Sequence, residues 1–286
     1  MIRKKKSVFS FFSKSLLVIN LIAASLLLLS YTASFIDPQT FWPIAFLGLA
    51  YPIFFLINIL FIVYWLLRSS KWALISVLCV SAGYKFINSH IGFRETTAIE
   101  VPKSSQSFLR VLTYNVHDFK KFGSKNDEFT KDQILDIIRK EQPDVLCIQE
   151  FFSRKKGDYN FIKLITEIMN TNHYYFEPSI DNGYEALGMA IFSKLPIINK
   201  GKIPFEEGQG NGALFADIQF NNKPVRIYNV HFQSIRFQPE DYKYLKEITK
   251  EQDVESSRRI GSRLKRAFLK RSDQVKLVKA HTEKCG

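Results

Sequence analysis

Three polar residues in the second half of the chain each follow a short apolar run, and their side chains suit phosphate chemistry. They are Asn115, Glu150 and His231. A buried carboxylate is costly unless it is paired or binds a cation, so Glu150 is a candidate metal ligand. The Asn115 amide offers a further oxygen ligand. The His231 imidazole can protonate a leaving oxygen or hold a phosphate oxygen near neutral pH.

Each of these residues also has a simpler interpretation. Glu150 can mark the point where a strand reaches solvent, and a lone histidine such as His231 is more often a satisfied surface or core group. The site hypothesis therefore depends on convergence. If several strands end on one rim, the carboxylate, the amide and the imidazole meet in a single pocket for a phosphate ester.

Short apolar strands alternate with amphipathic helices over the part of the chain that carries these residues, which predicts a mixed α/β domain. Helices are expected over 132–142, which Pro143 closes, and over 159–169. From 240 to about 284 the pattern is mainly helical. Strands are expected over 109–116, 145–149, 188–192, 197–203, 213–220 and 225–230.

Four segments of the chain, in this order, resemble the endonuclease/exonuclease/phosphatase superfamily. This superfamily includes pancreatic deoxyribonuclease, bacterial exonuclease III, inositol-polyphosphate phosphatases and neutral sphingomyelinases. The resemblance covers about residues 108–286, and the combination of its second and third segments is quite specific. The four segments are 113–116, 143–150, 188–197 and 229–232.

The resemblance implies two β-sheets flanked by helices, a four-layer α/β sandwich of the deoxyribonuclease I type, with the site at one rim. It implies that Glu150 ligates Mg²⁺, with Mn²⁺ as the alternative ion, and that Asn115 helps to organise the metal and its water. It further implies that His231 contacts the scissile phosphate or assists the leaving group. A bound cation of this kind withdraws charge from the phosphoryl oxygens during in-line attack by water.

The chain departs from the family pattern toward its end. The family's Gly-Asp-x-Asn motif and its terminal Asp-His pair do not occur in the sequence, and the one Gly-Asp pair, at Gly157, lies in a polar loop. The chain ends at Gly286, roughly where the next core strand of the family would begin. We therefore expect a domain over 108–286 that is incomplete at its C-terminus, as in a truncated gene product or a partial sequence.

The late helical segment is rich in basic residues, and the whole chain carries a formal net charge of +13. Such a segment could track a nucleic-acid backbone or lie against anionic lipid headgroups, and the simpler interpretation is a solvated helix face. Arg271 and Gln274 resemble the family's Arg-x-x-Gln pattern, with a mainly structural role. The basic residues are Arg258, Arg259, Arg263, Lys265, Arg266, Lys270, Arg271, Lys276 and Lys279.

Residues 1–100 are expected to form a membrane anchor, joined to the soluble domain by a polar linker at 101–107. The ranges 15–36 and 41–67 contain no charged residue, and each exceeds the roughly 20 residues that a helix needs to cross a bilayer. Pro43 and Pro52 are expected to kink the second span. A third span over about 72–90 contains Lys85, and its alternative is a helix lying on the bilayer surface.

The distribution of basic residues orients this anchor. The cluster from Arg3 to Lys6 places the N-terminus in the cytoplasm, and Arg68 with Lys71 marks the next cytoplasmic loop. Three spans would place the soluble domain outside the cytoplasm, whereas two would leave it inside. We expect three spans in a bacterial inner membrane. A cleaved signal peptide is the rival interpretation of the first apolar run.

The sequence thus predicts a membrane-anchored, Mg²⁺-dependent phosphoesterase that acts on nucleic acid, a phospholipid headgroup or an inositol phosphate. The alternative is a catalytically inactive, membrane-tethered binding or scaffolding domain. The three cysteines, Cys79, Cys147 and Cys285, lack the spacing of a disulfide framework or a zinc site. The lipid bilayer and the phosphoester substrate are the partners that the sequence indicates, and it gives no reason to propose a protein partner.

Overall fold

The computed structural model describes residues 11–68, 71–90, 107–121, 123–124, 127–205, 210–247 and 253–285. The chain divides into two compact units, one formed by Met1–Ala98 with Phe237–Ser272 and the other by Ile99–Arg236 with Asp273–Gly286. The basic cluster from Arg3 to Lys6 lies outside the described residues, as does the expected linker at 101–107 except for its last residue.

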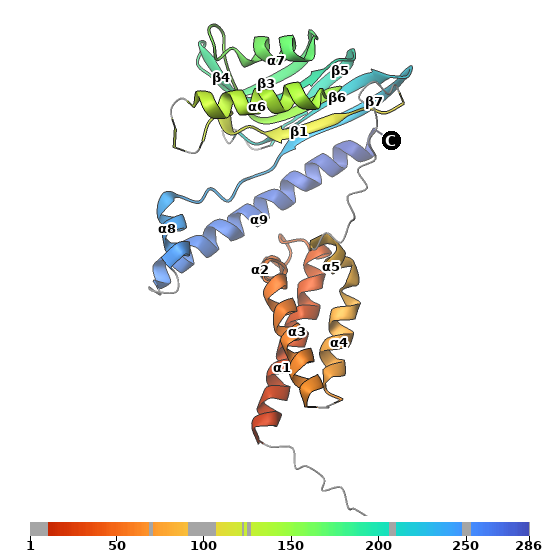
Figure 1. The fold of residues 1–286 in the computed structure, drawn as a ribbon, viewed down its shortest axis with the longest axis vertical. Helices are drawn as coiled ribbons and strands as arrows, with labels where there is room; N and C mark the ends of the chain where they lie inside the picture. Colours follow the sequence, from red (N-terminus) through yellow and green to blue (C-terminus); the bar gives the residue numbers. More distant parts are fainter. Residues whose placement is uncertain are drawn as a thin grey trace, which may run out of the picture. The chain divides into compact units, whose positions relative to one another are not determined.

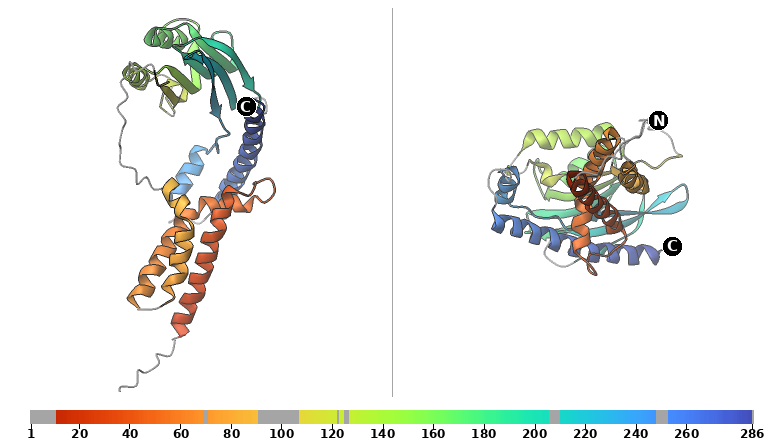
Figure 2. Two further views of the ribbon diagram at one scale, coloured as in Figure 1. Left: turned by 90° about the vertical axis from the view of Figure 1, so that its right-hand side faces the viewer. Right: turned by 90° about the horizontal axis from the view of Figure 1, so that it is seen from below.

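The first unit contains apolar helices that run side by side (Figures 1 and 2). In the described chain, Phe11–Ser34 is the one continuous helix long and apolar enough to cross a membrane, with a mean hydropathy of 2.1. A second apolar stretch is bent by 56° between α2 and α3, where Pro52 lies in the first turn of α3, as the prolines led us to expect. The helices are α1 (Phe11–Tyr31), α2 (Pro43–Leu49), α3 (Tyr51–Leu67), α4 (Ala73–Ala82) and α5 (Tyr84–His90).

A buried hydrogen-bond network joins three of these helices. Asn20 of α1 donates to Ser76 of α4 at 2.6 Å, and the Ser76 hydroxyl donates to Asn58 of α3 at 2.8 Å. Trp65 of α3 donates its indole N–H to Asn20 Oδ1 at 2.9 Å, and Asn58 also donates to the carbonyl of Ala23. The three polar side chains, at positions 20, 58 and 76, are fully buried, so the network satisfies groups that would otherwise be costly in an apolar bundle.

Two further helices complete the first unit, α8 (Pro239–Glu247) and the first two thirds of α9 (Val254–Glu283). Gln39, in the loop after α1, donates to the Leu269 carbonyl at 3.0 Å. Lys265 lies 4.4 Å above the Trp42 ring, and Phe268 packs edge-on against Phe46. The face of α9 that carries these residues is therefore attached to the loop between the first two apolar stretches.

The second unit contains two β-sheets that pack face to face. The first sheet has the order β1-β2-β4-β3, with β1 and β2 parallel, and the second is the antiparallel meander β5-β6-β7. The core between the sheets includes Cys147 and Ile191 from the first and Leu214 from the second. The strands are β1 (Val111–Asn115), β2 (Val145–Arg154), β3 (His173–Asp181), β4 (Glu185–Ser193), β5 (Ile197–Ile203), β6 (Gly212–Phe220) and β7 (Lys223–His231).

Helices α6 (Glu128–Glu141) and α7 (Phe161–Met169) cover the outer face of the first sheet (Figure 1). Asp127 caps α6 by accepting from the Thr130 N–H, and Asn160 caps α7 by accepting from the Lys163 N–H. On the outer face of the second sheet, His281 near the end of α9 packs on Phe215. The second unit thus has four layers, helix, sheet, sheet and helix, and the prediction of a mixed α/β fold is confirmed.

The strands differ from expectation in two places. β3 was not predicted, because its sequence mixes aromatic and polar residues, contains Pro178 and is exposed over much of its length, as edge strands often are. β2 does not end at Gln149 but continues to Arg154. The interpretation of Glu150 as the residue that closes an apolar strand is therefore wrong, since Glu150 lies inside β2.

Candidate active site

The three residues singled out from the sequence lie together around one carboxylate oxygen. Oε1 of Glu150 accepts a hydrogen bond from Asn115 Nδ2 at 3.1 Å, and His231 Nε2 lies 3.5 Å from the same oxygen. Asn115 ends β1, Glu150 lies within β2, and His231 ends β7 in the other sheet. The cluster therefore joins the two sheets at one edge of the sandwich, where the strand ends were expected to converge.

A β-bulge in β2 explains how Glu150 reaches the second sheet. The pairing with β4 shifts between Ile148 and Phe151, and Glu150 has a left-handed backbone with φ 51°. Ile148 and Phe151 both pack in the core beneath the helices, whereas the two residues between them contact β7. The extra residue thus turns two consecutive polar side chains, Gln149 and Glu150, toward the same face.

Asn229 of β7 holds this bulge from the opposite sheet. Its side-chain amide donates to the carbonyls of Ile148 and Ala190, both at 2.9 Å, and its Oδ1 accepts from Gln149 Nε2 at 2.6 Å. Gln149 also donates to Thr113 of β1 at 3.1 Å. Asn229 is 1% exposed, so every one of its side-chain hydrogen bonds is shielded from water.

Gln149 and Asn229 were not among the site residues predicted from the sequence. Both occur in the segments that carry the family resemblance, but a buried pair eighty positions apart leaves no local pattern. Both contact the segment around Glu150, Asn229 through the Ile148 carbonyl and through Gln149. The signal that could have found them is a polar residue one or two positions before a predicted site residue, as Gln149 precedes Glu150 and Asn229 precedes His231.

The backbone after β1 orients Asn115. Asn115 Oδ1 accepts the N–H of His117 at 3.1 Å, which leaves Nδ2 directed at Glu150. His117, Asp118 and Phe119 then have φ values of 46°, 56° and 60°, a run of left-handed residues without glycine. Each such residue costs of order 1–3 kcal/mol, and strain of this kind persists only where the surrounding structure imposes it. Phe119 anchors the turn, since it is buried and stacks on Phe161.

The environment of His231 determines which of its nitrogens carries the proton. Within the described part of the chain, Nδ1 is buried and has no hydrogen-bond partner, whereas Nε2 faces Glu150. A buried nitrogen without an acceptor is better left without a hydrogen, so the neutral ring carries its proton on Nε2. Nε2 is then a hydrogen-bond donor at the site, suited to a phosphoryl oxygen or to a leaving oxygen.

The residues present fit a hard divalent cation in part. Among the described residues, no group of three or more His, Cys, Asp and Glu side chains could hold a metal ion. Mg²⁺, however, keeps several waters and is commonly bound by one or two carboxylates with oxygen donors nearby. Glu150 supplies one carboxylate, half-exposed at the edge of the sandwich, whereas Asn115 directs Nδ2 and not Oδ1 toward it, so the expected oxygen ligand from Asn115 is turned away.

A cavity of about 480 Å³ is lined by residues of β3, β4, β5 and β6 and by none of the three cluster residues. Gly212, which lines it, pairs directly with His231 across the β6–β7 ladder. Met189 lines it from β4, next to Gly188, where an added Cβ would lie 2.1 Å from the Glu177 carbonyl oxygen. Asn211 Oδ1, also in the lining, is a buried acceptor without a hydrogen-bond partner in the described structure.

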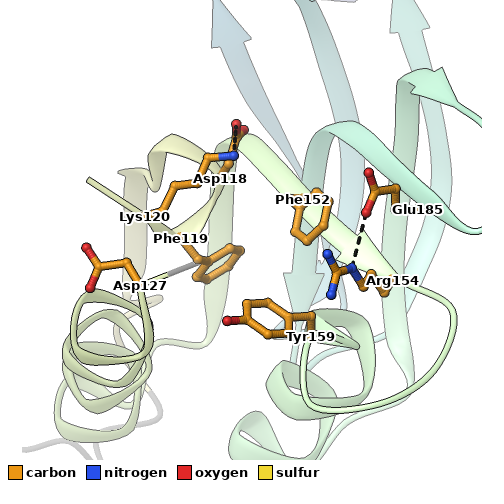
Figure 3. Close-up of a pocket in the computed structure, with 8 residues that line it drawn as sticks. All are labelled: Asp118, Phe119, Lys120, Asp127, Phe152, Arg154, Tyr159 and Glu185. Carbon is orange, nitrogen blue, oxygen red and sulfur yellow. Dashed lines mark hydrogen bonds and ion pairs between the residues drawn. The ribbon is translucent and has the colours of Figure 1, made fainter. Parts of the chain in front are cut away.

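A smaller cavity of about 130 Å³ lies between η2 (His117–Phe119), α6 and the second half of β2 (Figure 3). Its charged side chains are compensated: Arg154 pairs with Glu185 at 3.1 Å and Lys120 with Asp118 at 3.4 Å. A hydrogen bond to the Glu128 carboxylate raises the pKa of Tyr159, in the lining, to about 12. The carboxylates that line this cavity therefore already interact with other groups of the protein.

The late basic segment is helical, and its Arg-x-x-Gln pair is structural in part. Gln274 is buried and accepts the backbone N–H of Gln233 at 2.8 Å, two residues after His231. Arg259 and Arg263 both pair with the buried Asp241. The solvated-face interpretation thus does not hold for these three residues.

Comparisons with known proteins agree with this architecture. Residues 112–268 match the model of the Endonuclease/Exonuclease/phosphatase family, and residues 13–90 match a Domain of unknown function (DUF8431). No curated protein matches the chain.

Several solved structures are similar to the chain, and two of the following three carry the same family name. One is an endonuclease/exonuclease/phosphatase family protein from Leptotrichia buccalis C-1013-b, with 16% identity over 51% of this chain and 63% of that one and a TM-score of 0.35. Another, from Beutenbergia cavernae DSM 12333, has 19% identity over 51% and 44%, with a TM-score of 0.34. A third, ANGEL2, a 2',3'-cyclic phosphatase, has 19% identity over 48% and 44%, with a TM-score of 0.34.

The chain thus spans about half to two thirds of the length of these solved structures. The matched family model covers more than half of the chain and includes Asn115, Glu150 and His231. The chain therefore belongs to the endonuclease/exonuclease/phosphatase family.

Proposed function

We propose that the protein is a membrane-anchored phosphoesterase that uses Mg²⁺ at Glu150. The observation that carries the proposal is the meeting of Asn115, Glu150 and His231, from three strands and two sheets, around one carboxylate oxygen. A carboxylate can hold a divalent cation, an amide can add a polar contact beside it, and an imidazole can donate to a phosphoryl or leaving oxygen. The family membership of residues 112–268 supports the same reaction class.

Each residue has a distinct role in the proposed site. Glu150 binds the cation, which when bound withdraws negative charge from the phosphoryl oxygens. Asn115, oriented by the His117 N–H, holds the Glu150 carboxylate and adds a polar group at the metal position. His231 donates from Nε2 to a phosphoryl oxygen or to the leaving oxygen as negative charge grows there.

The substrate is a phosphoester, either in nucleic acid, in a phospholipid headgroup or in an inositol phosphate. The decisive measurement is Mg²⁺-dependent phosphate or headgroup release from DNA, sphingomyelin and inositol phosphates by the full chain in detergent or bilayers. We expect activity on one class, lost by at least 100-fold in Glu150→Gln, with Glu167→Gln as a matched change on the exposed face of α7. Unchanged activity in Glu150→Gln would remove Glu150 as the metal ligand. Metal-dependent phosphate binding without turnover would favour the inactive, tethered binding domain instead.

We also propose that the anchor crosses the membrane three times. The hydrogen bonds that Ser76 accepts from Asn20 and donates to Asn58 hold α4 alongside α1 and α3, which supports a span for α4 rather than a position on the bilayer surface. The contact between Gln39 and Leu269 supports the same number. It requires the segment 237–272 to be on the side of the membrane that α1 reaches at its C-terminal end.

One crossing precedes the loop at residue 39. The chain returns to the side of that loop only after two further crossings, which makes three in total. With two crossings, the segment 237–272 would share the side of the N-terminus, and the Gln39–Leu269 contact could not form. In a bacterial inner membrane with a cytoplasmic N-terminus, the phosphoesterase domain would then be extracytoplasmic. The test is labelling of Gln39→Cys and of native Cys285 in intact cells with a membrane-impermeant maleimide. Labelling of both supports three spans, and labelling of position 39 alone contradicts them.

A further inference from the structure

Helices α8 and α9 form a hairpin whose connected end, the second half of α8 with the start of α9, carries apolar and basic side chains. Tyr242, Leu245 and Val254 are 50%, 40% and 80% exposed. The exposed basic side chains beside them in the sequence are Lys243, Lys246 and Arg258. Single exposed apolar side chains are normal on soluble proteins, but apolar side chains beside basic ones on a helical hairpin are typical of a surface that meets a membrane interface.

The hairpin is held together by polar contacts of other side chains, and Tyr242 itself packs edge-on against Phe237. Asp241 is fully buried and accepts from Arg259 at 2.9 Å, with Arg263 at 3.2 Å from its other oxygen. The Tyr244 and Ser257 hydroxyls are 2.5 Å apart, which links α8 to α9 a second time. The apolar residues at the connected end are thus presented by a rigid support.

The contacts between α9 and the membrane anchor determine the depth of this surface relative to the bilayer. Lys265 lies over Trp42 and Phe268 against Phe46, at the start of the second apolar stretch, where tryptophan favours the headgroup region. Arg258 precedes Lys265 by two turns and so lies on the same face of α9. Val254 lies about 16 Å from Lys265 along the helix, so a helix lying near the bilayer plane would bring both positions to the same headgroup layer.

We propose that the connected end of the α8–α9 hairpin binds the surface of an acidic phospholipid bilayer. Tyr242, Leu245 and Val254 enter the headgroup region, while the three basic side chains contact lipid phosphates. A nucleic-acid backbone would use the charges alone and would leave the apolar side chains in water. The inference rests on the membrane anchoring proposed above.

The experiment uses the full chain with the substitutions Val254→Cys and Cys285→Ser and attaches an environment-sensitive fluorophore to position 254. The labelled protein is reconstituted into phosphatidylcholine vesicles with or without phosphatidylglycerol. Quenching by nitroxides attached to lipids reports contact with the bilayer. Ile22→Cys, in α1, is the positive control, and Ile180→Cys, on exposed β3, is the aqueous control. We expect position 254 to be quenched several-fold more than position 180, and more strongly with phosphatidylglycerol.

Charge reversal at Lys243, Lys246 and Arg258 should remove the phosphatidylglycerol dependence. Reversal of the exposed Lys155, Lys156 and Lys163 changes the net charge equally and should leave it intact. Quenching at position 22 with none at position 254 overturns the inference and leaves the anchor standing. No quenching at position 22 overturns the anchor itself. Protection of position 254 by DNA, with no response to lipid, identifies a nucleic-acid surface and also overturns the inference.

Discussion

Asn229 donates a hydrogen bond to the carbonyl of Ile148 across the gap between the two sheets, two residues before Glu150. The bond fixes the carbonyl at the point where the regular β2–β4 ladder is interrupted. Without it, the bulge that turns Glu150 toward His231 would lack its support from the second sheet. The geometry of the candidate site therefore depends on a residue that contacts neither the substrate nor the metal.

Asn229→Leu should destabilise the second unit and disable the site. The change removes two donors and one acceptor from buried partners, each worth about 1–3 kcal/mol when left unsatisfied, so a loss of about 3 kcal/mol or more is expected. Chemical denaturation monitored by circular dichroism measures it. Asn199→Ala, which removes one hydrogen bond to Asp217 at an exposed position, is the control and should cost less than about 1.5 kcal/mol. Equal losses in the two variants would contradict the role of Asn229.

Glu150→Gly should separate stability from function. The left-handed backbone at Glu150 costs a residue with a Cβ about 1 kcal/mol or more, and glycine adopts it freely. We expect the variant to be as stable as the parent or about 1 kcal/mol more stable, while metal-dependent phosphoester hydrolysis is lost. Thermal denaturation and the phosphate-release assay measure the two properties. A variant that loses more than about 1 kcal/mol would show that the Glu150 contacts outweigh its backbone strain.

Acidification should loosen the α8–α9 hairpin. The Gln238 N–H donates to Asp241 and, with Arg259 and Arg263, holds the pKa of its carboxyl below the usual range. A lowered pKa in the folded state contributes stability above the ordinary aspartate pKa of about 4, and that stability is lost as the pH falls through the lower, folded value. The gap in melting temperature between the parent and Asp241→Asn should therefore be largest near neutrality and should close on acidification. Glu240→Gln, at the neighbouring exposed position, should show no such trend.

The buried thiol of Cys147 should report on the integrity of the sandwich. Burial raises the pKa of Cys147 to about 12, so its reactive thiolate is scarce at about pH 8, whereas Cys285 is exposed. We expect maleimide to modify Cys285 rapidly and Cys147 only after denaturant is added, as measured by peptide mass spectrometry. Modification of Cys147 in the native protein at the rate of an unfolded peptide would indicate that the sheets separate.

The sequence predicted the site residues better than the backbone that holds them. Asn115, Glu150 and His231 were chosen because each follows an apolar run, and the structure brings the three together. The run before Glu150 was taken as a complete strand, since apolar periodicity cannot reveal a bulge. The roles assigned to the three residues stay a prediction.

What the sequence missed depends on contacts between distant segments. The edge strand β3 has no clear alternation, and the pairing of Gln149 with Asn229 joins two sheets. In the anchor, the apolar lengths indicated the spans over 15–36, 41–67 and 72–90, but the network at Asn20, Asn58 and Ser76 follows only from the packing of three helices. Isolated polar residues in apolar segments carry no information on which partner they will meet.

The bulge in β2 reverses which residues of the strand, even-numbered or odd-numbered, face the helices. Before it, even-numbered residues such as Ile148 point toward the helices, and after it odd-numbered residues such as Phe151 do so. Deleting a single residue here would restore the ladder, and the strand would still pair and bury its apolar side chains. Only one of the two polar side chains, Gln149 or Glu150, would then remain on the face toward the second sheet. One inserted residue therefore separates a strand that presents both the Glu150 carboxylate and its neighbouring amide from a regular strand that presents only one of them.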